Sequence, residues 1–161
     1  MSNQPQRELR AGVIGLGVGE QHVIGYNNAP GVRVVSVCDI DPAKLKEVAD
    51  RQDVPGRFTD WRRITEDPDI DVISIASYDD AHAEQCVSAF HHGKHVMVEK
   101  PVALNRADAE AVLRAQQDSG KLITSNLILR HVPRFRELRR RVQSGEFGDI
   151  FCIEGDYIHE I

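Results

Sequence analysis

The stretch AGVIGLGVG, residues 11–19, constrains the fold of this chain more than any other. Its apolar residues lead directly into closely spaced glycines, and a polar segment with helical spacing follows. This order is typical of a buried strand, a tight turn and the first turn of a helix. Backbone N–H groups at such a turn can approach a phosphate closely, and the helix dipole favours its negative charge. The stretch therefore predicts a nucleotide ligand held by Gly15, Gly17, Val18 and Gly19.

Strand-like and helix-like segments alternate along the rest of the chain. The predicted strands cover residues 9–14, 32–38, 71–76, 95–98, 122–124 and 151–158, with a short one near Phe58. The predicted helices cover residues 19–28, 43–51, 61–65, 81–92, 105–119 and 132–144. Strand–helix repeats of this size predict an α/β fold of the Rossmann type, a doubly wound parallel sheet with helices on both faces. Asp41, Asn105 and either Asp79 or Asp80 are expected to cap helices.

Composition excludes several other classes of protein. The 161 residues suit one domain, and 41% apolar with 28% charged residues is typical of a soluble globular protein, here expected in the cytoplasm. The net charge of −5 argues against a nucleic-acid partner, and the short apolar runs predict neither a signal peptide nor a membrane span. Cys38, Cys86 and Cys152 are far apart, so we expect buried or inert thiols and no metal site.

The ends of two predicted strands carry residues suited to a dinucleotide. Asp39 directly follows the strand at 32–38, about 20 residues past the glycines, where a carboxylate can accept hydrogen bonds from ribose hydroxyls. Its charge repels a 2′-phosphate, so NAD is predicted and NADP is disfavoured, with Ile40 beside the same ribose. Ser77 and Tyr78 follow the strand at 71–76 and are expected to line the edge of the cofactor.

An acid and a base stand side by side after the strand at 95–98. Burying Glu99 and Lys100 near each other is costly unless the two charges are used or paired. Lys100 could hydrogen-bond a substrate hydroxyl and relay its proton, which makes it the candidate catalytic residue.

The glycine spacing leaves alternatives open. The usual dinucleotide pattern, G-x-G-x-x-G, would place its third glycine at Glu20, whereas this chain has G-x-G-x-G. We interpret the difference as a dinucleotide turn shortened by one residue. A methyltransferase that binds S-adenosylmethionine is the second interpretation, although such enzymes commonly carry an acid at the position of Val13. A tight turn with no ligand is the third.

The motifs taken together resemble one family. GVIGLGVGEQH, CDIDP, DVISIASYDDAHAEQ, GKHVMVEKPVAL and SGEFGDI follow the order and spacing of the Gfo/Idh/MocA oxidoreductases over nearly the whole chain. Glu-Lys-Pro after the GKHV strand is the most specific element of the resemblance.

This resemblance implies hydride transfer between NAD and a secondary alcohol of a small-molecule sugar, cyclitol or related polyol. It places a set of residues at matching positions of the site. Gly15, Gly17 and Gly19 would face the pyrophosphate and Asp39 the adenosine ribose; Ser77, His82, Glu99 and Asn126 would contact the cofactor; and Lys100 and Arg130 would contact the substrate.

The resemblance also bears on domain organisation, because members of the family are much longer. Their C-terminal α/β domain supplies the substrate pocket and a sheet used for dimerisation. Residues 1–146 are therefore predicted to be the dinucleotide-binding domain, and 147–161 the first strand of a substrate domain that is missing here. We expect NAD binding with little turnover, and a homo-oligomer. The alternative is a non-catalytic NAD-binding module, or a subunit that needs a partner chain.

Overall fold

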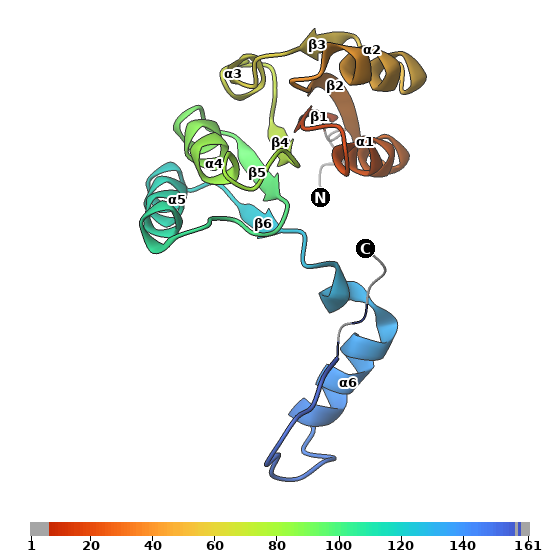
Figure 1. The fold of residues 1–161 in the computed structure, drawn as a ribbon, viewed down its shortest axis with the longest axis vertical. Helices are drawn as coiled ribbons and strands as arrows, with labels where there is room; N and C mark the ends of the chain where they lie inside the picture. Colours follow the sequence, from red (N-terminus) through yellow and green to blue (C-terminus); the bar gives the residue numbers. More distant parts are fainter. Residues whose placement is uncertain (1–6, 157, 159–161) are drawn as a thin grey trace, which may run out of the picture. The chain divides into compact units, whose positions relative to one another are not determined.

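A computed structural model of the chain describes residues 7–156 and 158 (Figure 1). Its sheet has six parallel strands in the order β3-β2-β1-β4-β5-β6. The strands are β1 Leu9–Ile14, β2 Val32–Cys38, β3 Gly56–Phe58, β4 Val72–Ile75, β5 His95–Val98 and β6 Ile123–Ser125. The order reverses between β1 and β4, and ligands of such sheets bind beyond the carboxyl ends of the strands at this point. The predicted Rossmann-type fold is confirmed.

Helices cover both faces of the sheet (Figure 1). They are α1 Gly19–Asn28, α2 Pro42–Arg51, α3 Arg62–Thr65, α4 His82–His91 and α5 Arg106–Ser119. Alternation along β1 divides the core in two, because successive side chains point to opposite faces. Val13 packs with residues of α1 and α2, whereas Ile14 packs with residues of α3, α4 and α5.

Side chains cap two of the three helices for which the sequence predicts a cap. The Asp41 carboxylate accepts hydrogen bonds from the backbone N–H groups of Ala43 and Lys44, and Asn105 caps α5 in the same way. The prediction of Asp79 or Asp80 as the cap of α4 is wrong. Ala81 precedes that helix in a right-handed helical conformation and has no side-chain cap, because a turn closed by the Ala81 N–H on the Tyr78 carbonyl leads into it.

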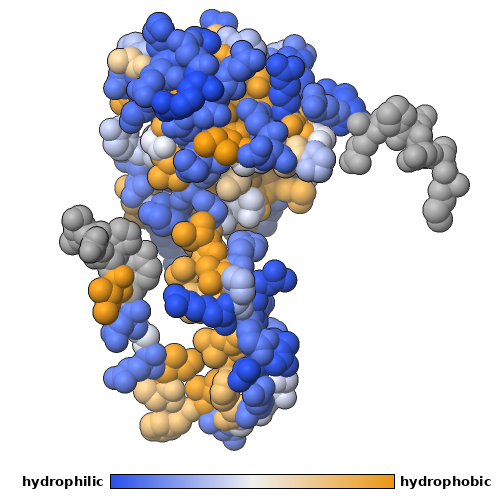
Figure 2. Space-filling model, turned by 90° about the vertical axis from the view of Figure 1, so that its right-hand side faces the viewer, coloured by the Kyte–Doolittle hydropathy of each residue, from blue (hydrophilic) through white to orange (hydrophobic). Residues whose placement is uncertain are grey.

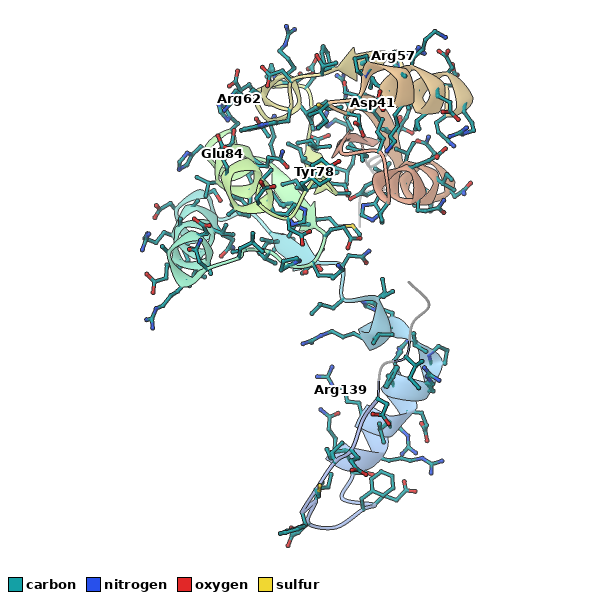
Figure 3. All side chains as sticks on the ribbon, viewed as in Figure 1. Asp41, Arg57, Arg62, Tyr78, Glu84 and Arg139 are labelled. Atoms are coloured by element: carbon teal, nitrogen blue, oxygen red, sulfur yellow. The ribbon has the colours of Figure 1, made fainter. Side chains whose placement is uncertain are left out.

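Surface ion pairs join neighbouring helices of the same layer. Arg62 on α3 donates to Glu84 on α4 over 3.0 Å, and both side chains lie near the surface (Figure 3). Exposed pairs of this kind contribute less than about 1 kcal/mol each. The fold therefore depends on its two apolar layers.

Residues 127–161 form a second compact unit. It contains the 3₁₀ helix η1 Ile128–His131 and the helix α6 Pro133–Gln143. Hydrogen bonds from Arg140, and then from Arg141, lower the pKa of Glu137 to about 2. Apolar side chains of this unit, among them Leu138 and Phe147, are exposed (Figure 2).

The strand predicted at 151–158 is not present in the part of it that the structure describes. Residues 151–156 and 158 have no regular secondary structure, and Tyr157 lies outside the described residues. Phe151 and Ile153 are exposed. A strand needs a neighbour to accept its backbone hydrogen bonds, and no strand of the described unit pairs with this segment.

Two of the cysteines are buried, as predicted. Burial raises the pKa of both thiols, Cys38 and Cys86, to about 12, with the Asp39 and Asp60 carboxylates adding to the shift at Cys38. Both thiols therefore stay protonated and unreactive at neutral pH. Cys152 is exposed. Among the described residues, no helix has both the length and the apolar character needed to cross a bilayer.

We expect Ile73→Ala to destabilise the domain strongly. Ile73 lies on the central strand β4 and is fully buried, so truncation leaves a cavity and costs about 2–5 kcal/mol in the free energy of unfolding. Leu113→Ala on α5, where the side chain is 54% exposed, is the matched control and should cost far less. Urea denaturation measures both, and equal losses would contradict the assigned core.

Candidate functional site

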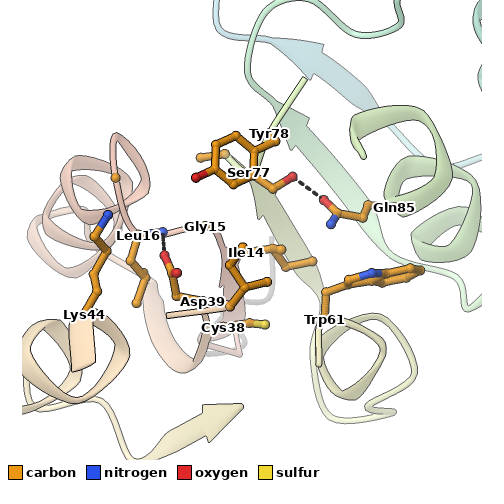
Figure 4. Close-up of a pocket in the computed structure, with 13 residues that line it drawn as sticks. Ile14, Gly15, Leu16, Cys38, Asp39, Lys44, Trp61, Ser77, Tyr78 and Gln85 are labelled. Carbon is orange, nitrogen blue, oxygen red and sulfur yellow. Dashed lines mark hydrogen bonds between the residues drawn. The ribbon is translucent and has the colours of Figure 1, made fainter. Parts of the chain in front are cut away.

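A pocket opens at the carboxyl edge of the sheet, beside the switch point between β1 and β4 (Figure 4). Its walls come from the turn after β1, the end of β2 and the loop after β4. Six of the residues predicted from sequence line it: Gly15, Gly17, Asp39, Ile40, Ser77 and Tyr78. Segments far apart in the chain thus meet where the fold is expected to place a ligand.

The three glycines of the turn after β1 are favoured at their positions for different structural reasons. Gly15 has φ +84°, and a Cβ there would lie 2.4 Å from the carbonyl oxygen of Ala76. A Cβ on Gly19 would lie 3.1 Å from Cγ1 of Val13, so this glycine allows α1 to pack closely on β1. A Cβ on Gly17 would meet nothing within 4 Å. The space next to Gly17 is open pocket, so this glycine is the one that leaves room for a ligand.

The same turn presents backbone donors. The N–H groups of Gly15 and Leu16 donate to the Cys38 carbonyl and the Asp39 carboxylate, each over 2.8 Å. Within the described residues, the N–H groups of Gly17 and Val18 have no acceptor. They lie just before the first residue of α1, where the helix dipole adds partial positive charge. This arrangement suits an anionic group such as a diphosphate.

Asp39 joins the glycine turn to the end of β2. One carboxylate oxygen accepts the Leu16 N–H over 2.8 Å, and the other accepts the Asp41 N–H over 2.9 Å. These two bonds fix the orientation of the carboxylate, and the residue is only 9% exposed. Each oxygen of a carboxylate has a second lone pair, so Asp39 can still accept ribose hydroxyls from the pocket.

Glu20, which stands where the usual third glycine would be, is directed to α2. Its carboxylate accepts hydrogen bonds from Arg51 Nε at 2.7 Å and from Gln52 Nε2 at 2.9 Å. These bonds, the one from Arg51 first, lower the pKa of Glu20 and keep it ionised at neutral pH. Gly19 is the glycine that permits the close contact of helix and strand, one position earlier than in the usual pattern, as a shortened turn requires.

The loop after β4 is held by two side chains of α4. Ser77 Oγ donates to Gln85 Oε1 over 2.6 Å (Figure 4). His82 is fully buried and does not line the pocket. Its Nδ1 lies 2.7 Å from the Pro101 carbonyl oxygen and its Nε2 lies 3.1 Å from that of Ser77. His82 therefore joins the loops that follow β4 and β5, and its predicted contact with the cofactor stays a prediction.

The predicted acid–base pair lies at the end of β5. Asn126 Nδ2 donates to Glu99 Oε1 over 2.6 Å, and the Lys100 backbone N–H donates to Glu99 Oε2 over 3.3 Å. The Lys100 side chain is exposed, and the peptide bond to Pro101 is cis. The structure thus brings Glu99, Lys100 and Asn126 together. Arg130 lies on η1 of the second unit, so its place at the site stays a prediction.

Seven residues that line the pocket were not predicted as site residues: Ile14, Leu16, Cys38, Lys44, Trp61, Ala76 and Gln85. Lys44 lies in the first turn of α2, next to the carboxyl end of β2, and its position after the Asp41 cap could have revealed it. Trp61 follows β3, and the Arg62 guanidinium lies 4.2 Å from the centre of its ring. Trp61 is the only tryptophan of the chain and gives the pocket an intrinsic fluorescent reporter.

Comparison with known proteins identifies the family. Residues 9–127 match the family model described as the oxidoreductase family with an NAD-binding Rossmann fold. The chain belongs to the Gfo/Idh/MocA oxidoreductase family. The resemblance inferred from the sequence motifs is confirmed, and so is NAD as the cofactor of this domain type.

Relatives in this family include polyol dehydrogenases. Inositol 2-dehydrogenase of Salmonella typhimurium is 31% identical over 91% of this chain and 45% of its own length. The structure of scyllo-inositol dehydrogenase from Lactobacillus casei with bound NAD(H) and scyllo-inositol has a TM-score of 0.83 at 25% identity, over 89% of this chain and 43% of that one. A relative from Bacteroides fragilis named glycosyl hydrolase family 109 protein 1 is 30% identical, over 95% of this chain and 35% of its own length.

The chain spans about half the length of the curated relatives it matches, 45% for the inositol dehydrogenase. The match covers the NAD-binding domain that the family model describes.

We expect Gly15→Ala to destabilise the protein and Gly17→Ala to leave its stability nearly unchanged. A side chain in the left-handed region costs about 1–2 kcal/mol, and the alanine at position 15 also meets the Ala76 carbonyl. Thermal unfolding measured by circular dichroism compares the two variants. Equal melting temperatures would show that the turn is not built as described.

Proposed function

We propose that this chain is the NAD-binding part of a dehydrogenase that transfers hydride between NAD and a secondary alcohol of a polyol, cyclitol or sugar. The observation that carries the proposal is the joint placement of the glycine turn and Asp39 in one pocket, at the same edge of the sheet as Glu99 and Lys100, which follow β5. Inositol dehydrogenases among the relatives support the substrate class.

The residues present fit a dinucleotide at this edge. The pyrophosphate would lie against the unpaired N–H groups of Gly17 and Val18, near Gly19 at the start of α1. The adenosine ribose would lie between Asp39 and Ile40 on the β2 side of the switch point. Because the other half of the cofactor must extend across β1 and β4, we place the nicotinamide near the ends of β4, β5 and β6.

The second half of the site supplies the proton chemistry. Ser77 and Tyr78 would border the cofactor from the loop after β4, and His82 would hold that loop through its contact with the Ser77 carbonyl. Lys100 would hold the substrate hydroxyl and accept its proton as the carbon is oxidised. NAD, when bound, supplies the hydride acceptor, and the protein supplies position and electrostatics.

The rest of the proposal concerns the whole protein. We assign residues 1–146 to the dinucleotide-binding domain and 147–161 to the start of a substrate domain. Arg130 would then reach the substrate. We place the protein in the cytoplasm, where Cys38 and Cys86 stay reduced, and infer a homo-oligomer of the kind the family forms.

Calorimetric titration of the 161-residue chain with NAD⁺, NADP⁺ and S-adenosylmethionine tests the proposed cofactor. We expect NAD⁺ to bind and NADP⁺ to bind at least about tenfold more weakly, because a 2′-phosphate would face the Asp39 carboxylate. Quenching of Trp61 fluorescence should give the same affinities. Binding of S-adenosylmethionine in place of NAD⁺ would favour a methyltransferase, and binding of none of the three would contradict the proposal.

The variant Gly17→Val tests where the pyrophosphate lies. A Cβ at this position meets no protein atom within 4 Å, and the valine methyl groups would occupy the space of the phosphates. We expect at least about a tenfold loss of NAD⁺ affinity, the loss of more than one good hydrogen bond, with little change in melting temperature. Gly25→Ala on α1 also has open space at its Cβ and lies outside the pocket, so it is the matched control. An unchanged affinity in Gly17→Val would place the cofactor elsewhere.

A further inference from the structure

His22 is a buried polar side chain of α1 to which the site described above gives no role. Its residue is only 8% exposed. Burying an imidazole is costly unless its ring nitrogens have hydrogen-bond partners. Both nitrogens have one: Nδ1 lies 2.6 Å from Ser74 Oγ on β4, and Nε2 lies 3.1 Å from Glu99 Oε1 after β5. His22 therefore connects α1 with the ends of two strands of the sheet.

The partners around Glu99 set the direction of these hydrogen bonds. Oε1 accepts from Asn126 Nδ2 over 2.6 Å, and Oε2 accepts from the Lys100 backbone N–H over 3.3 Å. A carboxylate oxygen can only accept, so the His22 nitrogen that faces Oε1 carries a hydrogen and donates it. Donors from α1, from the residue after β6 and from the chain at Lys100 therefore hold one carboxylate in a single orientation.

The position of this network matters because its two ends belong to opposite halves of the site. α1 begins at Gly19, directly after the turn assigned to the pyrophosphate. Glu99 and Lys100 follow β5, on the other side of the switch point from Asp39. The side chain of His22 crosses from the helix to this second half. Among the described contacts, it is the one side chain of α1 that hydrogen-bonds Glu99.

We infer that His22 is a positioning residue for the nicotinamide half of the site. With Ser74 behind it, His22 holds the Glu99 carboxylate, and Glu99 in turn holds the backbone from which the Lys100 side chain extends. The inference rests on the proposed function, because it takes NAD to lie across this edge of the sheet. It assigns to α1 a second task, besides presenting its N-terminus to the phosphates.

A purely structural role for His22 makes a different prediction. If the network only holds α1 against the sheet, its loss would displace the glycine turn and weaken the binding of every ligand that contacts the turn. ADP-ribose carries the adenosine, the pyrophosphate and the second ribose of NADH but has no nicotinamide. The affinities of the two ligands therefore distinguish the two roles. A disturbed nicotinamide half weakens NADH binding alone, whereas a displaced helix weakens the binding of both.

The experiment measures NADH and ADP-ribose affinities by calorimetry for wild type, His22→Leu and His22→Gln. We expect His22→Leu to lower the affinity for NADH by about tenfold, as for loss of one hydrogen bond to a charged group. Its affinity for ADP-ribose should fall by less than about twofold. His22→Gln should recover part of the NADH affinity, because its side-chain amide can donate to Glu99 as Nε2 does. His92→Leu, which replaces an exposed histidine next to α4, is the control and should change neither affinity.

The outcomes separate the inference from the proposed function. If wild type binds neither ligand, the cofactor proposal itself fails. If wild type binds both and His22→Leu weakens them equally, or weakens neither, the positioning role is wrong. If His22→Leu does not fold, Ser74→Ala removes only the hydroxyl behind Nδ1. That variant should also lose affinity for NADH and keep its affinity for ADP-ribose, with a smaller loss than in His22→Leu. An unchanged NADH affinity in this variant would overturn the inference.

Discussion

The hydrogen bond from the Leu16 N–H to the Asp39 carboxylate, 2.8 Å long, joins the two strand ends that define the pocket. It links the turn after β1 to the residue after β2, and the Gly15 N–H bond to the Cys38 carbonyl reinforces the link. The turn can then present its remaining N–H groups to an anion in a fixed geometry. Because Asp39 is oriented by backbone donors before any ligand arrives, little further ordering is needed when a ribose binds.

The elements that the sequence predicted well are those whose reason is local. β-Branched residues place β2 at Val32–Cys38 and the apolar run places β1 at Leu9–Ile14, both with the predicted bounds. Asp41 caps α2 because its side chain bonds to backbone only two and three residues away. The predicted cap of α4 was wrong because the preceding turn already gives Ala81 a helical conformation, which the residue type alone does not reveal.

Interactions between distant residues account for what sequence reasoning could not find. His22 and Glu99 are separated by 77 positions, and no spacing rule within α1 marks His22 as a partner of β5. Trp61 and Lys44 enter the pocket because β3 and α2 pack beside β2, a consequence of strand order. His82 was expected at the cofactor, yet burial places it beneath the two loops it joins. The turn glycines, by contrast, were predicted from their spacing after an apolar strand, although the close contacts at Gly15 and Gly19 include Ala76 after β4.

We propose that the glycine turn and Asp39 hold NAD at the carboxyl edge of β1 and β2. A crystal structure of the chain grown with NAD⁺ tests this placement. We expect diphosphate oxygens within hydrogen-bond distance of the Gly17 and Val18 N–H groups, and a ribose hydroxyl on the Asp39 carboxylate. A cofactor bound at another edge of the sheet, or an empty pocket at saturating NAD⁺, would contradict it.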